Sequence, residues 1–112
     1  MMGIPIPAEY GGLGGTFQTY VKVVEEIAKA CASSSLIVAV QELAMLPILI
    51  AGTDDQKKKY LPKLASGEWI AAYALTESGS GSDAAGSMRT RAEKRGDKYI
   101  LCLLYTSPSP RD

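Results

Sequence analysis

The chain has 112 residues, 46% of them apolar, and its 12 basic and 12 acidic residues give a formal net charge of zero. This composition predicts a folded core rather than a disordered segment, and it lacks the basic surface that nucleic-acid binding requires. Histidine is absent, so a Ser-His-Asp or Cys-His nucleophile cannot be built within this chain. With only Cys31 and Cys102 we expect neither a zinc site nor a disulfide framework, and we interpret Cys31 as a small buried apolar residue.

The N-terminal segment is rich in proline and glycine. Pro5 and Pro7 favour an extended path over residues 4–7, because proline and the residue before it both avoid the helical conformation. Residues 11–15, Gly-Gly-Leu-Gly-Gly, could be mistaken for a phosphate-binding loop, but no strand pattern precedes them and no Lys-Ser/Thr pair follows. We interpret them as a structural turn. No basic stretch precedes an apolar run here, so we expect no secretory signal.

The first predicted helix is amphipathic. Apolar residues recur at helical spacing from Phe17 to Cys31, and Thr16 is placed to act as the N-cap. Glu25 and Lys29 lie four residues apart, in the favoured orientation for a helix pair on the solvated side. The pattern therefore predicts a helix that buries one face.

The second predicted helix runs from Leu36 to Ala51. The triple serine at 33–35 is expected to break the first pattern and to cap this helix. Because the stretch is apolar nearly all round, it is typical of a helix buried among others. Pro47 is expected to kink it or divide it in two, and Gly52 to end it. The stretch is shorter than the roughly 20 residues that a membrane span needs, so we predict a core helix and no membrane span.

The third predicted helix opens with a capping box. Thr53 and Gln56 have the spacing at which each side chain bonds the backbone N–H of the other. We expect the helix to run to about Leu64, with Pro62 as a kink or an early end.

After Gly67 the pattern changes from helical to β. Residues 69–75 are interpreted as a buried strand, and residues 88–93 and 98–101 as two strands joined by a turn at 95–97. A helical block followed by a β block predicts an α+β chain.

We therefore divide the chain into three parts. Residues 1–67 are predicted to be part of an all-helical domain, and residues 68–101 the start of a β domain. Residues 102–112 contain two prolines two apart, which oppose a central strand, and they resemble the translation of a DNA-library adapter. We interpret this tail as non-native read-through and give Cys102 no redox or ligand role.

One stretch, residues 73–86, carries the chemistry. After the predicted strand it alternates glycine with the hydroxyl residues Thr76, Ser78, Ser80 and Ser82. Glycine lets the backbone turn sharply and bring its N–H groups close to a ligand, and the hydroxyls add donors. Such a loop is suited to holding a polyanion such as a phosphate.

Three stretches, residues 3–15, 50–62 and 74–86, together resemble the acyl-CoA dehydrogenases. This family consists of flavoenzymes with a helical N-terminal domain, a middle β domain and a C-terminal helical bundle. The resemblance implies a truncated chain, with a helical block followed by the first strands of a β-barrel-like middle domain. The chain departs from the family at Ser78, where many members have proline, and at Cys102, where the family continues with Asn-Gly.

The resemblance implies FAD as the cofactor and assigns roles by position. Ser82 would also touch the acyl-CoA substrate. No catalytic residue is expected in this chain, because the family's base is a glutamate of the C-terminal bundle; we therefore interpret Glu77 as structural, pairing within the loop. The residues implied to bind FAD are Tyr73, Leu75 and Thr76 along the flavin ring, and Gly81 and Ser82 at the pyrophosphate.

The implied reaction is α,β-desaturation of an acyl-CoA thioester, with electrons passing to an electron-transferring flavoprotein. Residues 36–46 would line the far end of the acyl pocket. The resemblance further implies a homo-oligomer, and the lack of a targeting segment is expected for a cytoplasmic protein, or for a mitochondrial matrix protein in a eukaryote.

Two other readings remain open at this point. One keeps the fold and changes the chemistry to an acyl-CoA oxidase, a nitroalkane oxidase or a flavin monooxygenase. The other is a non-enzymatic helical interaction domain with a Gly-Ser linker. It is weakened because Thr76-Glu77 and Ser82-Asp83 stand at fixed places after a strand pattern.

Overall fold

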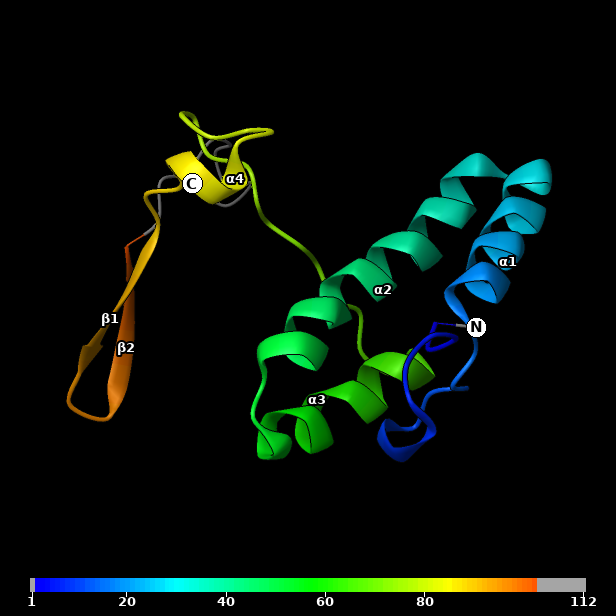
Figure 1. The fold of residues 1–112 in the computed structure, drawn as a ribbon, viewed down its shortest axis with the longest axis horizontal. Helices are drawn as coiled ribbons and strands as arrows, with labels where there is room; N and C mark the ends of the chain where they lie inside the picture. Colours follow the sequence, from blue (N-terminus) through cyan, green and yellow to red (C-terminus); the bar gives the residue numbers. More distant parts are fainter. Residues whose placement is uncertain (1, 103–112) are drawn as a thin grey trace. The chain divides into compact units, whose positions relative to one another are not determined.

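The computed structural model describes residues 2–102, so the predicted tail lies, apart from Cys102, outside the described residues. The chain divides into two compact units, which are described separately: a helical unit, residues 1–73, and a loop-and-hairpin unit, residues 74–112. The helical unit contains η1 (Ala8–Tyr10), α1 (Phe17–Ala30), α2 (Ala32–Ala51) and α3 (Asp54–Ser66). The second unit contains α4 (Ala84–Ser87), β1 (Arg91–Arg95) and β2 (Lys98–Cys102) (Figure 1).

The glycine-rich N-terminal segment folds back on itself as a structural turn, as predicted. Gly11 and Gly14 have φ values of 77° and 61°, a region that side chains disfavour. At Gly12 a Cβ would lie 2.0 Å from the carbonyl oxygen of Ile6. The turn is closed by backbone bonds, among them Gly15 N to Ile4 O at 2.7 Å. Positive φ and close backbone approach explain these glycines.

The predicted N-cap of α1 is confirmed, but the ion pair on this helix forms between other residues than predicted. The Thr16 side chain accepts a hydrogen bond from Thr19 N at 3.1 Å. Lys29 pairs with Glu26 at 2.6 Å, three residues back, whereas Glu25 was expected. Both spacings bring side chains to the same helix face, so the choice between two adjacent glutamates depends on rotamers that the sequence does not fix.

The break between α1 and α2 was predicted at the wrong place. The triple serine lies inside the first turn of α2, where Ser35 Oγ donates to Ala32 O at 2.7 Å. Cys31 alone is extended, with φ −157° and ψ 108°, and it separates the two helices. Cys31 is also exposed, so its interpretation as a buried apolar residue was wrong.

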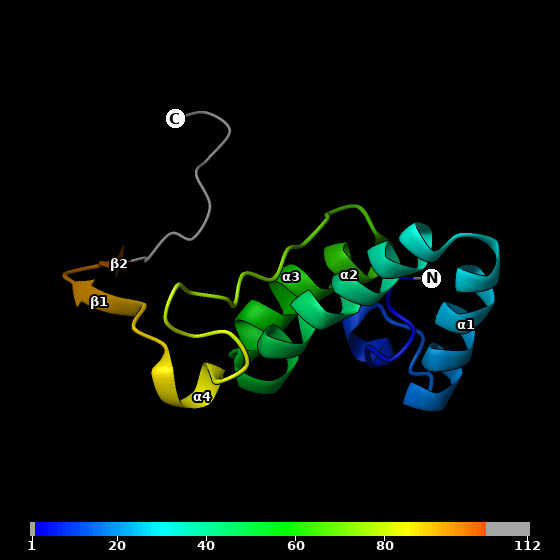
Figure 2. The ribbon, with the colours of Figure 1, turned by 90° about the horizontal axis from the view of Figure 1, so that it is seen from above.

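Helix α2 is the central element, packing against α1 and against α3 (Figure 1, Figure 2). It runs unbroken through Pro47 for 20 residues, so the expected division is wrong. It is thus longer than predicted, and by length and composition alone it could cross a membrane, a test that core helices also pass. One face is buried, but Leu36 and Ile50 remain 62% and 78% exposed.

Helix α3 confirms the predicted capping box. Gln56 N donates to Thr53 Oγ1 at 3.3 Å, and Thr53 N donates to Gln56 Oε1 at 2.9 Å. Pro62 does not end the helix, which continues to Ser66. Gly67 follows it in the left-handed conformation, with φ 83°.

Two apolar clusters hold the helical unit together. The larger one joins the N-terminal segment, α2 and α3, and its residues Ile6, Met45 and Leu61 are fully buried. The smaller one joins the N-terminal segment, α1 and α2 through Ile4, Tyr20 and Val38.

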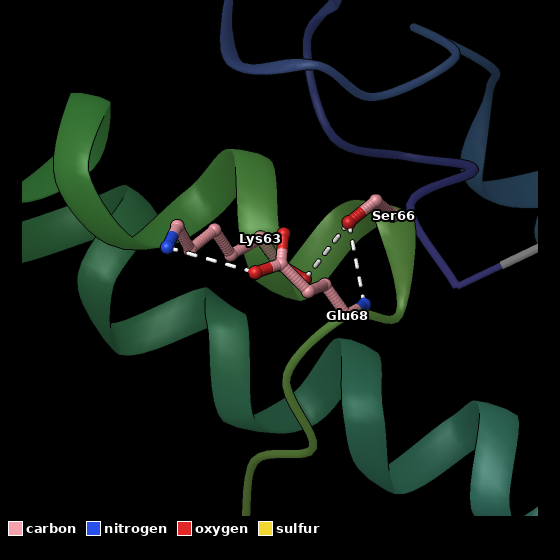
Figure 3. A network of polar contacts seen from close by, with 3 residues as sticks. All are labelled: Lys63, Ser66 and Glu68. Atoms are coloured by element: carbon pink, nitrogen blue, oxygen red, sulfur yellow. Dashed lines mark hydrogen bonds and ion pairs between the residues drawn. The ribbon is translucent and has the colours of Figure 1, made fainter.

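The segment after α3 is not the strand that the sequence predicted. It is irregular and leaves α3 through a local polar network: Ser66 Oγ donates to Lys63 O at 3.0 Å, and Glu68 N donates to Ser66 Oγ at 3.3 Å (Figure 3). Lys63 Nζ lies 3.6 Å from Glu68 Oε1 (Figure 3) and 4.5 Å from the centre of the Trp69 ring. Local contacts with α3 therefore fix the start of this segment.

Strands β1 and β2 form an antiparallel hairpin, as predicted. The register pairs Arg91 with Cys102 and Arg95 with Lys98, so the connection is two residues long. Gly96, the first of these, has φ 64°, the position at which a type II′ hairpin turn favours glycine. Strand β1 begins at Arg91, three residues after the predicted start, and the backbone N–H groups of Arg89 and Thr90 just before it donate to the Glu77 carboxylate.

Candidate functional site

The loop-and-hairpin unit holds most of the predicted site residues near its surface. Thr76, Gly81 and Ser82 are exposed, and Leu75 is half-buried. Tyr73 is the last residue of the helical unit and is 42% exposed. Four of the predicted site residues thus belong to one loop, namely Leu75, Thr76, Gly81 and Ser82. Tyr73 belongs to the unit before it.

Glu77 is the residue that shapes this loop from inside. It is only 6% exposed. Its carboxylate accepts hydrogen bonds from Arg89 N at 2.8 Å and from Thr90 N at 2.9 Å. The hydrogen bond from the Thr90 side chain, with those from the two backbone groups, lowers the pKa of Glu77 below its ordinary value. The carboxylate is therefore engaged within its own unit, in agreement with the predicted structural role. That Glu77 takes no part in catalysis stays a prediction.

The backbone at Glu77 forms a tight link with Ser80. Glu77 N donates to Ser80 O at 2.9 Å, and Ser80 N donates to Glu77 O at 3.1 Å. Ser80 is 3% exposed, and its Oγ donates to Asp83 O at 2.8 Å. Ser80 was predicted as a ligand donor, but in this structure its hydroxyl is used within the loop.

Asp83 closes the other end of the loop. Its carboxylate accepts from Gly86 N at 3.1 Å and from Ser87 Oγ at 2.7 Å, so it caps α4. Sequence reasoning did not single out Asp83 as structural, although an Asp three residues before the N–H that it caps has N-cap spacing. The loop is therefore braced by its own side chains.

Several hydrogen-bond donors of the loop remain unused by the contacts of Glu77, Ser80 and Asp83. Within residues 2–102 no hydrogen bond occupies the side chains of Thr76, Ser78 or Ser82, or the backbone N–H of Gly81. A Cβ added at Gly79 or Gly81 would meet nothing within 4 Å, so the backbone there is open to a close approach. Exposed hydroxyls and free N–H groups on an ordered glycine loop suit a polyanionic group.

The helical unit carries a separate hollow of about 350 Å³ between α2 and α3. Its lining is mostly apolar and consists of Pro47, Ile48, Ala51, Gly52, Gln56 and Tyr60. It does not involve residues 36–46, which were predicted to line the acyl pocket. Leu36, Ile37 and Leu43 are instead exposed on α2, at 62%, 58% and 42%.

Comparison with known proteins gives one consistent result. The family model for the acyl-CoA dehydrogenase N-terminal domain matches residues 1–68. An acyl-CoA dehydrogenase of Bacillus subtilis is 46% identical over 102 residues, which cover 90% of this chain and 27% of that protein. A 3-(aryl)acrylate reductase of Clostridium sporogenes is 45% identical over 100 residues, covering 88% of this chain and 26% of the relative. This chain therefore spans about a quarter of the length of these relatives.

Solved structures agree in fold. A chain from the structure of the electron transferring flavoprotein of Acidaminococcus fermentans superposes with a TM-score of 0.81 at 39% identity, covering 89% of this chain and 26% of its own length. An acyl-CoA dehydrogenase of Bacillus anthracis complexed with FAD superposes with a TM-score of 0.78 at 41% identity. The match covers 89% of this chain and 18% of the Bacillus anthracis chain. With the braced glycine–serine loop following three packed helices, these matches show that the chain belongs to the acyl-CoA dehydrogenase family.

Proposed function

We propose that the protein to which this chain belongs is an FAD-dependent acyl-CoA dehydrogenase that desaturates acyl-CoA thioesters between the α and β carbons. Membership of the family supports this proposal. The observation that carries it is the loop itself: the carboxylates of Glu77 and Asp83 accept hydrogen bonds from their own unit, while the side chains of Thr76, Ser78 and Ser82 and the open backbone at Gly79 and Gly81 lie at the surface.

The loop fits the polar part of FAD. In this proposal Gly81 and Ser82 would hold the pyrophosphate, with the open backbone at Gly81 allowing close approach. Tyr73, Leu75 and Thr76 would lie along the flavin ring, where a half-buried leucine offers apolar surface and an exposed threonine a donor. When bound, the flavin would supply the hydride-accepting chemistry. That the related Bacillus anthracis structure is complexed with FAD supports the assignment.

The chain would contribute binding and not proton abstraction. Two acidic residues adjoin the flavin-binding positions: Glu77 directly follows Thr76, and Asp83 directly follows Ser82. Both oxygens of each carboxylate already accept hydrogen bonds, those of Glu77 from Arg89 N and Thr90 N, and those of Asp83 from Gly86 N and Ser87 Oγ. We therefore place the base outside this chain. Ser82 would also contact the acyl-CoA, and the exposed apolar face of α2 would meet the acyl chain.

We further propose that an electron-transferring flavoprotein accepts the electrons and that the intact enzyme is a homo-oligomer. The likeness to a chain in the Acidaminococcus fermentans electron transferring flavoprotein structure supports the first partner. The apolar side chains that the helical unit exposes, among them Leu36 and Ile50, support the view that further protein covers this unit.

The visible spectrum of the intact gene product tests the proposal. We expect a yellow protein whose flavin absorbance is bleached anaerobically by an acyl-CoA, with little peroxide formed in air. Rapid peroxide formation would favour an oxidase or monooxygenase of the same fold, and turnover only from an unsaturated acid towards the saturated one would favour a reductase, as the Clostridium sporogenes relative is named. A colourless protein that ignores added FAD would contradict every flavin-based function.

A further inference from the structure

The Gln41 side chain makes an unusual set of contacts within the helical unit. Gln41 lies in the middle of α2 and is 3% exposed. Its Nε2 donates to Leu64 O at 2.9 Å and to Trp69 O at 2.8 Å. Its Oε1 accepts from Ala71 N at 2.9 Å. One side chain thus ties α2 to a segment 23 to 30 residues further along the chain.

The orientation of this amide is determined by its partners. Leu64 and Trp69 offer carbonyl oxygens, which accept only, and Ala71 offers an N–H, which donates only. Both amide hydrogens and the carbonyl of Gln41 are therefore used, and the flipped amide would place oxygen against two oxygens. A residue without both donor and acceptor could not make the same three bonds.

The contacts with Trp69 and Ala71 imitate a neighbouring strand. In a parallel ladder, one residue of the partner strand bonds the C=O of one residue and the N–H of the residue two further on. Gln41 does this on either side of Ile70, with its side-chain amide in place of a backbone amide. In the described residues no strand pairs with this segment, which explains why a sequence pattern of a buried strand forms an irregular but ordered segment.

We propose that Gln41 is a positioning residue for the flavin site: it fixes the path of residues 69–71 and so places Tyr73, two residues further on in the same unit. The inference rests on the proposed function, because it assigns Tyr73 to the flavin ring. Gln41 itself would not touch cofactor or substrate. Its effect would pass through the backbone of Ala71, whose N–H it holds at 2.9 Å.

The test compares two variants of the intact protein. Gln41→Met keeps the length of the side chain and removes all three hydrogen bonds. Ile4→Ala is the control, since Ile4 is equally buried at 5% exposure and belongs to the cluster with Tyr20 and Val38, away from residues 69–71. Both variants are expected to lower the melting temperature, so thermal stability alone does not decide the matter.

Three measurements separate positioning from mere stability. Below the melting transition of each variant, we expect Gln41→Met to accelerate hydrogen exchange at the Ala71 amide and to raise the FAD dissociation constant by about tenfold or more. It should also change the visible circular dichroism of the bound flavin. Ile4→Ala should leave all three readouts near those of the parent.

The outcomes are distinguishable. A parent protein that does not bind FAD overturns the proposed function and this inference with it. A parent that binds FAD, together with a Gln41→Met variant that binds it equally well and with the same dichroism, overturns the inference alone. If Gln41→Met does not fold, the same three measurements are made on Gln41→Asn, which keeps the amide on a shorter side chain. The same changes are expected, and their absence would overturn the inference.

Discussion

Glu77 and Thr90 are 13 residues apart in the chain and are joined by a hydrogen bond of 2.9 Å from Thr90 N to Glu77 Oε1. With the matching bond from Arg89 N to Oε2, this contact connects the start of the glycine–serine loop to the segment that enters β1. The loop is therefore shaped by a carboxylate that points inward, while the side chains of Thr76, Ser78 and Ser82 lie at its surface.

The first prediction concerns the role of Glu77. Replacing Glu77 by Gln turns one acceptor oxygen into a donor that faces a backbone N–H, so the loop should loosen. In the intact enzyme we expect turnover to fall by less than the roughly 10²–10⁴-fold that loss of a general base costs. Steady-state kinetics with a saturating acyl-CoA measures this. A larger loss in kcat would contradict the structural role.

The second prediction is the pH dependence of the same contact. Hydrogen bonds, first from the Thr90 side chain, lower the pKa of Glu77 in the folded state. Such a group stabilises the fold above its unfolded pKa of about 4.3, and the contribution is lost as the pH falls through the folded value. We expect the protection of the Arg89 and Thr90 amides against hydrogen exchange to decrease as the pH falls below that unfolded value. The Glu77→Gln variant should not show this loss of protection at low pH. If the loss persists in the variant, another group titrates.

The third prediction separates Gly81 from Gly79. A Cβ meets nothing within 4 Å at either position, so neither Gly→Ala change should lower the melting temperature by itself. If the backbone at Gly81 approaches the pyrophosphate, Gly81→Ala should raise the FAD dissociation constant by about tenfold, which corresponds to about 1.4 kcal/mol. Gly79→Ala serves as the matched control. Equal FAD affinities for the two variants would argue against Gly81 as a cofactor contact.

The fourth prediction concerns the N-terminal turn. In Gly12→Ala the new methyl carbon would lie 2.0 Å from Ile6 O, so the backbone must move. We expect a loss of about 1–3 kcal/mol in the free energy of unfolding, as for other overpacked sites. Leu13→Ala is the control, because Leu13 is 72% exposed and its truncation should cost less than about 0.5 kcal/mol. Denaturant unfolding gives both values, and a stable Gly12→Ala would show that the turn can relax.

The fifth prediction concerns the capping box of α3. Thr53→Ala removes the acceptor of Gln56 N and should destabilise the fold by about 1 kcal/mol. Because Thr53 and Gln56 act on each other, the double variant with Gln56→Ala should cost less than the sum of the single changes. Lys58→Ala, on the exposed side of the same helix, is the control. Strict additivity would mean that the two bonds form independently.

Features with local causes were predicted well. The cap at Thr16, the box of Thr53 and Gln56 and the turn predicted at 95–97, which the structure forms with residues 96–97, all depend on residues within three or four positions of each other. For the same reason the sequence could place the glycine–serine loop, since glycine and hydroxyl content act on the backbone directly.

Features that depend on distant partners were predicted poorly. The strand expected over residues 69–75 is absent, because its backbone groups bond to Lys63 and to Gln41, which the sequence pattern does not connect to them. Cys31 was expected in the core, but the helix break falls on it and leaves it exposed. Pro47 was expected to kink or divide α2, yet the helix runs through it from Ala32 to Ala51, with α3 packed against it.

The sequence by itself determined the caps at Thr16 and Thr53, the hairpin and the glycine turns, since each follows from residue types within a few positions of one another. That residues 73–86 bind a polyanion stays a prediction. Only the tertiary structure decided which donors of the loop remain free, because Glu77 reaches 12 and 13 residues along the chain and Ser80 is turned inward. Only the tertiary structure, too, connected Gln41 to Ala71. A buried amide needs partners, and the fold supplies them from a part of the chain that local sequence rules do not reach.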